Sequence, residues 1–261
     1  MQEMIWSLIK DKTLAELKQG IREDGRKFDQ YRDVKIDYEF TKNADGSASV
    51  RLGNTFVLAG VKLQPGEPYP DQPDQGTISV GAELLAMASP SFETGPPKED
   101  AIELSRVVDR GIRESDAIDF KSLCIREKEL VWITFLDLYI MNDDGNLFDA
   151  AAIAALAALK NTKFPKLGDD DKVVSGERTS KRLELNRLPM LNTFTKISDI
   201  LLADASLKET KAADARFSVC TTEDGYLSAF QKGGSGYFTK AEVSKCIDLA
   251  YINSDKLRKL L

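Results

Sequence analysis

Hydrophobic and polar positions follow two different periods along the chain, and together they predict both helices and strands. Residues 1–20 place apolar residues at helical spacing and Gly20 then provides a stop, so we expect an N-terminal helix there. Residues 34–40 instead alternate between apolar and charged side chains, which predicts a half-buried strand. The same reasoning predicts further strands at residues 47–52, 55–63, 78–87, 131–141, 191–196, 215–221 and 227–232.

Helical patterns and chain breaks organise the rest of the sequence. We expect a helix at residues 101–115, an alanine-rich helix at residues 150–159, and a last helix after Thr239, whose T-x-x-E spacing to Glu242 is a capping box. Residues 65–76 are rich in proline and glycine, which predicts an exposed loop. The expected class is α+β with mixed sheets. We divide the chain into an N-terminal helix (1–20), a first β-rich half (21–165), a connection (166–190) and a second β-rich half (191–261).

The amino-acid composition excludes several kinds of catalytic and metal site, but it says less about the fold. The sequence contains no histidine, which excludes a Ser-His-Asp triad, a Cys-His pair, a histidine-ligated zinc and a haem axial histidine. Its cysteines, Cys124, Cys220 and Cys246, are scattered, which is typical of free thiols in a reducing cytoplasm. We therefore expect a cytoplasmic protein without a metal site or cofactor, in which any catalysis would use carboxylates, lysine, tyrosine or bound ions.

The charge and hydropathy of the chain restrict its partners. It carries 42 acidic and 36 basic residues, so its net charge of −6 should repel nucleic acid unless a local patch or a basic partner binds it. The longest nearly apolar run, residues 150–159, is shorter than the stretch of about 20 residues that spans a bilayer. We expect no association with a membrane.

One basic patch is expected on a predicted helix. Arg106, Arg110 and Arg113 recur at i, i+4 and i+7, so they share one face while the apolar residues point the opposite way. Such a row suits phosphates, because each guanidinium presents a planar fork of donors. The alternative interpretation is an ordinary solvated face on which Glu103 and Asp109 are local partners.

The turn at residues 142–146 is a second candidate anion site, because it joins a strand to the N-terminus of a helix. However, Phe148 and Asp149 follow directly. A ring and a carboxylate therefore occupy the first helical turn, and we expect the carboxylate to fill the attractive potential and repel phosphate.

A second acidic segment lies further along the chain. Asp204, Glu209 and Asp214 could hold a magnesium ion or act as general acid and base, although Lys208 places a cation among them. Surface charges with one helix or strand cap are the alternative interpretation. Composition and spacing therefore lead to an α+β protein that carries one candidate anion-binding helix.

Six short segments carry a resemblance over almost the whole chain. They are IREDGR (21–26), GNTFVLAGVK (53–62), SRVVDRGIRES (105–115), DGNLFDAAAIAALAAL (144–159), NTKFPK (161–166) and D-x9-D (204–214). In this order they resemble the RNase PH superfamily, and within it the non-catalytic RNase PH-like subunits of the archaeal exosome. The resemblance implies an RNase PH-type fold with two related β-rich halves and packed helices. It also implies a ring of three heterodimers with a catalytic RNase PH-like subunit, on which RNA-binding cap proteins dock.

The resemblance further implies an activity and shows where this chain departs from it. The complex degrades RNA from 3′ to 5′ by phosphorolysis, and it lengthens RNA tails in the reverse reaction. Active members hold phosphate with a Gly-Gly-Thr-Arg type turn, whereas the matching stretch here ends in Phe148. They also carry two aspartates six residues apart, and the matching positions here are Lys208 and Asp214. A non-catalytic subunit that structures the partner's active site is therefore implied.

The same resemblance bears on the arginine helix. Family arginines at the corresponding positions hold the backbone of single-stranded RNA, which assigns that role to Arg106, Arg110 and Arg113. Two other hypotheses stay open at this point. One is a self-sufficient, metal-dependent 3′-to-5′ exoribonuclease that uses Asp204, Glu209 and Asp214, and the other is a small-molecule binding module unrelated to RNA.

Overall fold

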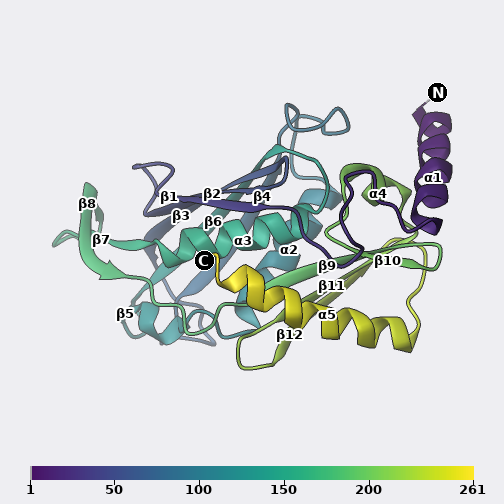
Figure 1. The fold of residues 1–261 in the computed structure, drawn as a ribbon. Coiled ribbons are helices and arrows are strands. Elements are labelled where there is room, and N and C mark those ends of the chain that lie inside the picture. The colour runs from purple at the N-terminus through teal and green to yellow at the C-terminus, as the bar shows by residue number, and fades with distance from the viewer. Residues whose placement is uncertain (1) are drawn as a thin grey trace.

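The largest sheet of the protein comes from the first half of the chain (Figure 1). The computed structural model describes residues 2–261, with side chains from residue 9 onward. The strand order is β1-β2-β3-β6-β4, and β5 pairs with β6 beside this path. The strands are β1 (Val34–Tyr38), β2 (Gly46–Leu52), β3 (Thr55–Gly66), β4 (Thr77–Leu84), β5 (Cys124–Arg126) and β6 (Leu130–Asn142), with a short 3-10 helix, η1 (Phe120–Leu123), before β5.

Strand β6 is the centre of this sheet, as its long apolar pattern predicts. It pairs antiparallel with β3 and parallel with β4, so the sheet is mixed. Its neighbour β3 runs further than expected, because Pro65 pairs with Trp132 instead of opening the loop. Pro65 stands one residue before the end of the strand, where a missing N–H removes little of the ladder. The loop therefore begins after Gly66.

The alanine-rich helix α3 (Leu147–Lys160) lies between the two main sheets and contacts β2, β3 and β9 (Figure 1). All of its residues from Asp149 to Leu159 are buried. Small side chains allow strands to approach this helix on several sides. Gly46 on β2 makes such an approach, since a Cβ there would overlap the carbonyl oxygen of Ala158.

The second half of the chain forms an antiparallel sheet in the order β10-β9-β11-β12. Helix α5 packs on β9 and β11, and its capping box between Thr239 and Glu242 is confirmed. The pattern did not predict β10 or α4, because both are shorter than the window over which a period can be seen. The elements are β9 (Met190–Ile197), β10 (Ile200–Ala203), α4 (Leu207–Ala212), β11 (Ala215–Thr221), β12 (Leu227–Gly233) and α5 (Lys240–Arg258).

A two-stranded hairpin joins the two halves and projects from the body of the protein (Figure 1). It consists of β7 (Lys163–Leu167) and β8 (Val173–Arg182). Residues 166–190, expected as a connection of weak pattern, therefore contain a regular strand. Most of β8 is exposed, so no hydrophobic period marks it in the sequence. The proposed division of the chain into halves stays a prediction.

Two further helices complete the architecture. Helix α2 (Glu99–Arg113) packs against β4 and α3, and it starts and ends two residues earlier than the sequence predicts. Helix α1 (Gln2–Lys18) packs against α4, and Leu17 lies in a small cluster with Ile197 and Leu202. The earlier apolar side chains of the predicted amphipathic pattern, up to residue 8, fall outside the described side chains.

The fold class is α+β, as predicted, but only part of it is mixed. In the described residues, the sheets of the second half and of the hairpin are wholly antiparallel. No helix within the described part is long and apolar enough to cross a membrane.

Candidate functional site

Helix α2 presents two free arginines to solvent. Arg106 and Arg110 are exposed, and neither guanidinium has a hydrogen-bond or ion-pair partner among the described residues. The opposite face, which includes Val107 and Val108, is buried in the main core. The sequence-based prediction of a helix with one buried face and an arginine face is confirmed.

The third arginine of this face is held in place. Arg113 is half-buried and pairs with Asp109 at 2.9 Å, while its Nη2 donates to the carbonyl oxygen of Ile78 at 2.8 Å. Its guanidinium also lies 5.6 Å from the ring centroid of Phe120. The local partner Asp109 of the alternative interpretation is therefore present for Arg113. The exposure of Arg106 and Arg110 agrees with a solvated face as well as with a phosphate-binding one.

The turn before α3 is held by hydrogen bonds with its own Asp143 and with Thr55 and Arg32 of other segments. Asn146, the residue before the helix, has a left-handed backbone with φ 52°. The Asp143 Oδ1 accepts a hydrogen bond from the backbone N–H of Gly145 at 3.0 Å, and burial raises the pKa of this carboxyl. The structure thus places a carboxylate at the start of the helix.

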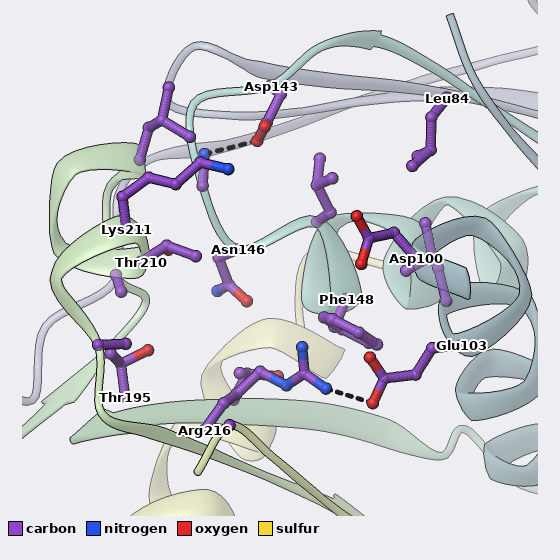
Figure 2. A pocket seen from close by; sticks show the side chains of 18 of the residues that line it. Leu84, Asp100, Glu103, Asp143, Asn146, Phe148, Thr195, Thr210, Lys211 and Arg216 are labelled. Atoms are coloured by element: carbon purple, nitrogen blue, oxygen red, sulfur yellow. Dashed lines mark hydrogen bonds and ion pairs between the residues drawn. The ribbon is translucent and has the colours of Figure 1, made fainter. Parts of the chain in front are cut away.

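Phe148 lies on the wall of a cavity of about 280 Å³ beside this turn (Figure 2). The guanidinium carbon of Arg216 lies 3.9 Å from the centroid of the Phe148 ring. The Nη2 of Arg216 donates to Glu103 at 2.5 Å, and Glu103 also accepts from Gln231 at 3.0 Å. Sequence reasoning missed Arg216, because β11 is distant from α3 in the chain and no motif links them.

Asp149 turns away from this cavity and into the interior. Its carboxylate is fully buried and accepts hydrogen bonds from the Tyr31 hydroxyl at 2.6 Å and from the backbone N–H of Thr193 at 2.9 Å. The Thr193 hydroxyl and the Asn146 amide also donate to it. Burial nevertheless raises the pKa of Asp149 to about 6. The expected carboxylate is present near the helix N-terminus, but it connects α3 to β9.

Comparison with known proteins identifies the family. Residues 30–165 match the first domain of the 3′ exoribonuclease family, RNase PH, and residues 188–253 match its second domain. The chain belongs to the RNase PH family. The Exosome complex component Rrp42 of Thermococcus gammatolerans is 44% identical over 263 residues, which cover 99% of this chain and 96% of that protein. The Rrp42 component of Methanopyrus kandleri is 44% identical over 258 residues, covering 98% and 97%.

Solved structures agree with this family. A chain of the Archaeoglobus fulgidus exosome with RNA bound to the active site superposes with a TM-score of 0.92 at 44% identity, and 98% of each chain is covered. A chain of an archaeal exosome core gives a TM-score of 0.88 at 40% identity, covering 99% of this chain and 98% of that one. The RNase PH-type fold expected from the sequence is therefore confirmed.

Among the described residues, the three acids of the metal-dependent hypothesis do not form a metal site. Asp204 is fully buried, and it pairs with Arg32 at 2.7 Å and Arg26 at 2.8 Å. Burial alone would raise the pKa of Asp204, but the hydrogen bonds and charge of Arg32 hold it below the ordinary value. The carboxylate of Asp204 is therefore already paired with arginines on the segment that follows α1.

The other two acids have separate partners. Glu209 forms a bidentate pair with Arg22 at 2.9 and 2.7 Å, and Asp214 pairs with Lys10 at 2.7 Å. The pKa of Asp214 is lowered by Lys10 and by the backbone N–H of Ser198. No group of three or more acidic or cysteine side chains in the described part of the chain could hold a metal ion. The geometry therefore disfavours the metal-dependent hypothesis.

Lys208 and Asp214, which the resemblance places at the positions of catalytic aspartates, do not meet in one place. Lys208 pairs with Glu23 at 2.5 Å on the surface, and it does not line the cavity beside Phe148. Asp214 does not line that cavity either. Thr210 and Lys211 line it instead, from the same segment. The segment around α4 therefore contributes side chains to the cavity wall other than the two that the sequence analysis singled out.

Proposed function

We propose that this chain is a component of an RNA-degrading exosome that binds the RNA backbone and does not itself catalyse phosphorolysis. The similar chains that are named exosome components, and the similar exosome structure with RNA bound, support the assembly. The observation that carries the non-catalytic role is Phe148, which lines the cavity at the N-terminus of α3 where active relatives have arginine.

Phosphate would find little stabilisation in this cavity. A helix N-terminus attracts phosphate when its N–H groups and nearby cations face the ligand. Here the only guanidinium on the described wall, that of Arg216, is already paired with Glu103 and covers the ring of Phe148. Lys211 is the second cation of the described wall, and the carboxylates of Asp100 and Asp143 lie on the same wall. The developing charge of a phosphorolytic transition state would therefore lack its clamp.

The acid that active relatives use is also missing. Lys208 occupies one of the two matching positions, and its ammonium is engaged by Glu23. Asp214 occupies the other, and its carboxylate is neutralised by Lys10 from α1. Neither side chain can exchange a proton with a substrate in the cavity from where it stands.

RNA contact is assigned to the exposed arginines of α2. Arg106 and Arg110 are free to pair with phosphates, and Arg113 extends the same face. Contacts of this kind position a nucleic acid without reading its sequence. These arginines form a local basic patch on a chain whose net charge of −6 repels RNA elsewhere. A catalytic RNase PH-like partner would therefore provide the rest of the RNA-binding path. We further propose three heterodimers with that partner in a ring, RNA-binding cap proteins on the ring, and a cytoplasmic location, which the three free cysteines favour.

The test compares this chain alone, the catalytic RNase PH-like subunit alone, and the two co-expressed. Each sample receives a 3′-labelled oligoribonucleotide with and without inorganic phosphate, and released nucleoside diphosphates are measured. We expect release only from the co-expressed pair, which should elute as a ring of about six chains. The reverse reaction with nucleoside diphosphates should lengthen RNA in the same sample only.

Two results would contradict the proposal. Phosphate-dependent release by this chain alone would make it an enzyme. Hydrolysis by this chain that needs a divalent ion, needs no phosphate and is abolished by a chelator would restore the metal-dependent hypothesis.

A further inference from the structure

Four aromatic side chains form a continuous row on the second sheet, beside the N-terminus of α5. The centroid of the Phe217 ring lies 5.7 Å from that of Phe230 and 5.5 Å from that of Phe238. Tyr237 extends the row, because the ammonium of Lys196 lies 4.8 Å from the Tyr237 ring centroid and 5.9 Å from that of Phe238. We call these four aromatic residues the aromatic row.

The middle of the aromatic row is packed, whereas its two ends are open to solvent. Phe217 is only 8% exposed, but Phe230 is 42% and Tyr237 is 74% exposed. The rings of Phe217 and Phe230 are stacked, with an angle of 14° between their planes. Because β12 is the edge strand of the described sheet, no further strand covers Phe230 on the side away from Phe217 (Figure 1). The stack therefore ends in an accessible ring.

The segment that carries the exposed rings is basic, although the whole chain is acidic with a net charge of −6. Residues 228–247 contain three lysines, and their single acidic residue is Glu242. The carboxylate of Glu242 is already paired with Lys196 at 2.7 Å. The three lysines are all exposed, and they are Lys232, Lys240 and Lys245. Positive charge is therefore available to an anionic ligand beside the aromatic row.

Phe230 and Lys232 have the spacing that a nucleotide requires. They stand two residues apart on β12, so both side chains project from the same face of the strand, about 7 Å apart along it. The Nζ of Lys232 donates to the carbonyl oxygen of Gly234 at 2.6 Å, which leaves two of its three N–H donors for a ligand. A planar ring and a phosphate joined through one ribose can meet both side chains at once.

We propose that the aromatic row and its lysines are a second binding site for single-stranded RNA. One base stacks on the open ring of Phe230 and another on Tyr237, while Lys232 and Lys240 pair with phosphates. Stacking of this kind tolerates any sequence, because every base has a π-face. A purely apolar partner would gain nothing from the lysines, and a basic partner would be repelled by them. The choice of RNA as the ligand rests on the proposed function, but the site shares no residue with α2.

The experiment titrates the full chain with a fluorescent oligoribonucleotide of about ten nucleotides and follows binding by anisotropy. An oligomer of the same length with abasic ribose at every position keeps the phosphates but has nothing to stack. It should bind about tenfold more weakly than the RNA. RNA that contains 4-thiouridine should cross-link under ultraviolet light to Phe230 or Tyr237, and mass spectrometry of the digested protein locates the cross-link.

Two exposed tyrosines provide a matched pair of variants. Tyr237→Ser removes one stacking ring and should weaken RNA binding by about fivefold or more. Tyr226 is 64% exposed and precedes β12 at the opposite end of the strand, so Tyr226→Ser should leave binding unchanged. Phe230→Leu should weaken binding as Tyr237→Ser does, because leucine keeps the apolar contact with Phe217 but offers no π-face. The circular dichroism of all three variants should match that of the parent chain.

The α2 double variant, Arg106→Gln with Arg110→Gln, separates this inference from the proposed function. It is titrated with the same RNA, alone and combined with Tyr237→Ser. If the α2 variant weakens binding and the aromatic variants do not, this inference alone fails. If the aromatic variants weaken binding and the α2 variant does not, the RNA contact proposed for α2 fails and the aromatic row stands.

Several results would overturn this inference. It fails if the full chain does not bind the RNA, if the abasic oligomer binds as tightly as the RNA, or if Tyr237→Ser and Tyr226→Ser bind equally well. It also fails if the cross-links lie outside the aromatic row. If the aromatic variants keep RNA binding but no longer elute with the catalytic RNase PH-like subunit, the aromatic row is a protein interface and the inference is wrong.

Discussion

The protein uses arginine in two opposite ways. On the segment after α1, Arg22 has a fully buried side chain, and Arg26 and Arg32 are nearly buried. On α2, Arg106 and Arg110 are exposed and unpaired among the described residues. The same side chain therefore joins distant parts of the fold in one place and is left available to a ligand in the other. What differs is whether the tertiary structure brings a carboxylate to it.

The buried group connects segments that are far apart in the sequence. Arg22 reaches Glu209 at the start of α4, and Arg32 reaches Asp204. Arg32 also donates to the carbonyl oxygens of Asp144 and Gly145, in the turn before α3. One short segment thus holds the turn of the first half against the second half.

The largest expected effect tests the buried group. Arg22→Met should lower the free energy of unfolding by about 3–5 kcal/mol, because it leaves the buried Glu209 without its cation. Urea unfolding followed by circular dichroism measures this change. Lys208→Met is the control, since its pair with Glu23 is exposed and should contribute about 1 kcal/mol or less. Equal losses in the two variants would refute the distinction between buried and exposed pairs.

The second prediction concerns the effect of arginine partners on the pKa of a buried carboxyl group. Asp149 and Asp204 are both fully buried, but only Asp204 has arginine partners. Carbon-detected NMR of the carboxyl groups should give Asp149 a pKa of about 6, and Asp204 a pKa below the ordinary value of 3.8.

These two carboxyl groups should change stability with pH in opposite directions. The contribution of Asp149 is largest below its unfolded pKa and declines as the pH rises toward 6. The contribution of Asp204 is present above its unfolded pKa and is lost as the pH falls through the folded one. If both groups titrated together, the arginine partners would have no electrostatic role.

The third prediction concerns the exposed pair in the assembled complex. Arg106→Gln with Arg110→Gln should weaken RNA binding and leave the free energy of unfolding within about 0.5 kcal/mol of the parent value. Each lost phosphate contact with single-stranded RNA should reduce the slope of log affinity against log salt by about 0.7, so the double variant should lose about 1.4. Fluorescence anisotropy at several salt concentrations measures the slope.

A matched charge control accompanies that double variant. Lys166→Gln with Lys172→Gln removes two exposed charges from the β7–β8 hairpin and its turn, away from α2. RNA binding should keep its slope in this control. An equal loss of slope in both double variants would show that Arg106 and Arg110 act only through the total charge of the protein and not through direct contact with RNA.

The smallest expected effect separates Arg113 from its neighbours. Arg113→Gln should weaken RNA binding less than Arg110→Gln does, because Asp109 and the carbonyl oxygen of Ile78 already hold the Arg113 guanidinium. The same anisotropy titration at one salt concentration compares the two single variants. A larger loss for Arg113→Gln would show that the pair with Asp109 opens when RNA binds.

The local pattern of hydrophobic and polar residues predicted most of the fold, because a long helix or a half-buried strand has a regular hydrophobic spacing that is visible in the sequence. The residues 215–221 form β11 as expected, and Thr239 caps α5. Short or exposed elements leave no such trace, which is why α4, β10 and the exposed strand β8 were missed. Pro65 misled the prediction because a proline near the end of a strand resembles the start of a loop.

Some features of the candidate site could likewise be predicted from the sequence, and others could not. The periodicity of α2 suffices to place Arg106 and Arg110 on one exposed face, since neighbours on a helix are set by spacing alone. It could not separate Arg113 from them, because the carbonyl oxygen that holds Arg113 belongs to β4. Arg216 was missed for the same kind of reason, since its partners Phe148 and Glu103 come from other elements.

The sequence by itself therefore determined the class of fold, the family and the exposed face of α2, because each depends on residue type and local spacing. Tertiary structure alone decided the partners of the charges. It buried Asp204 among arginines, paired Asp214 with Lys10 on α1, and stacked the Arg216 guanidinium on the ring of Phe148. The physical reason is that an ion pair or a hydrogen bond requires contact in space, which local spacing does not specify for residues far apart in the chain.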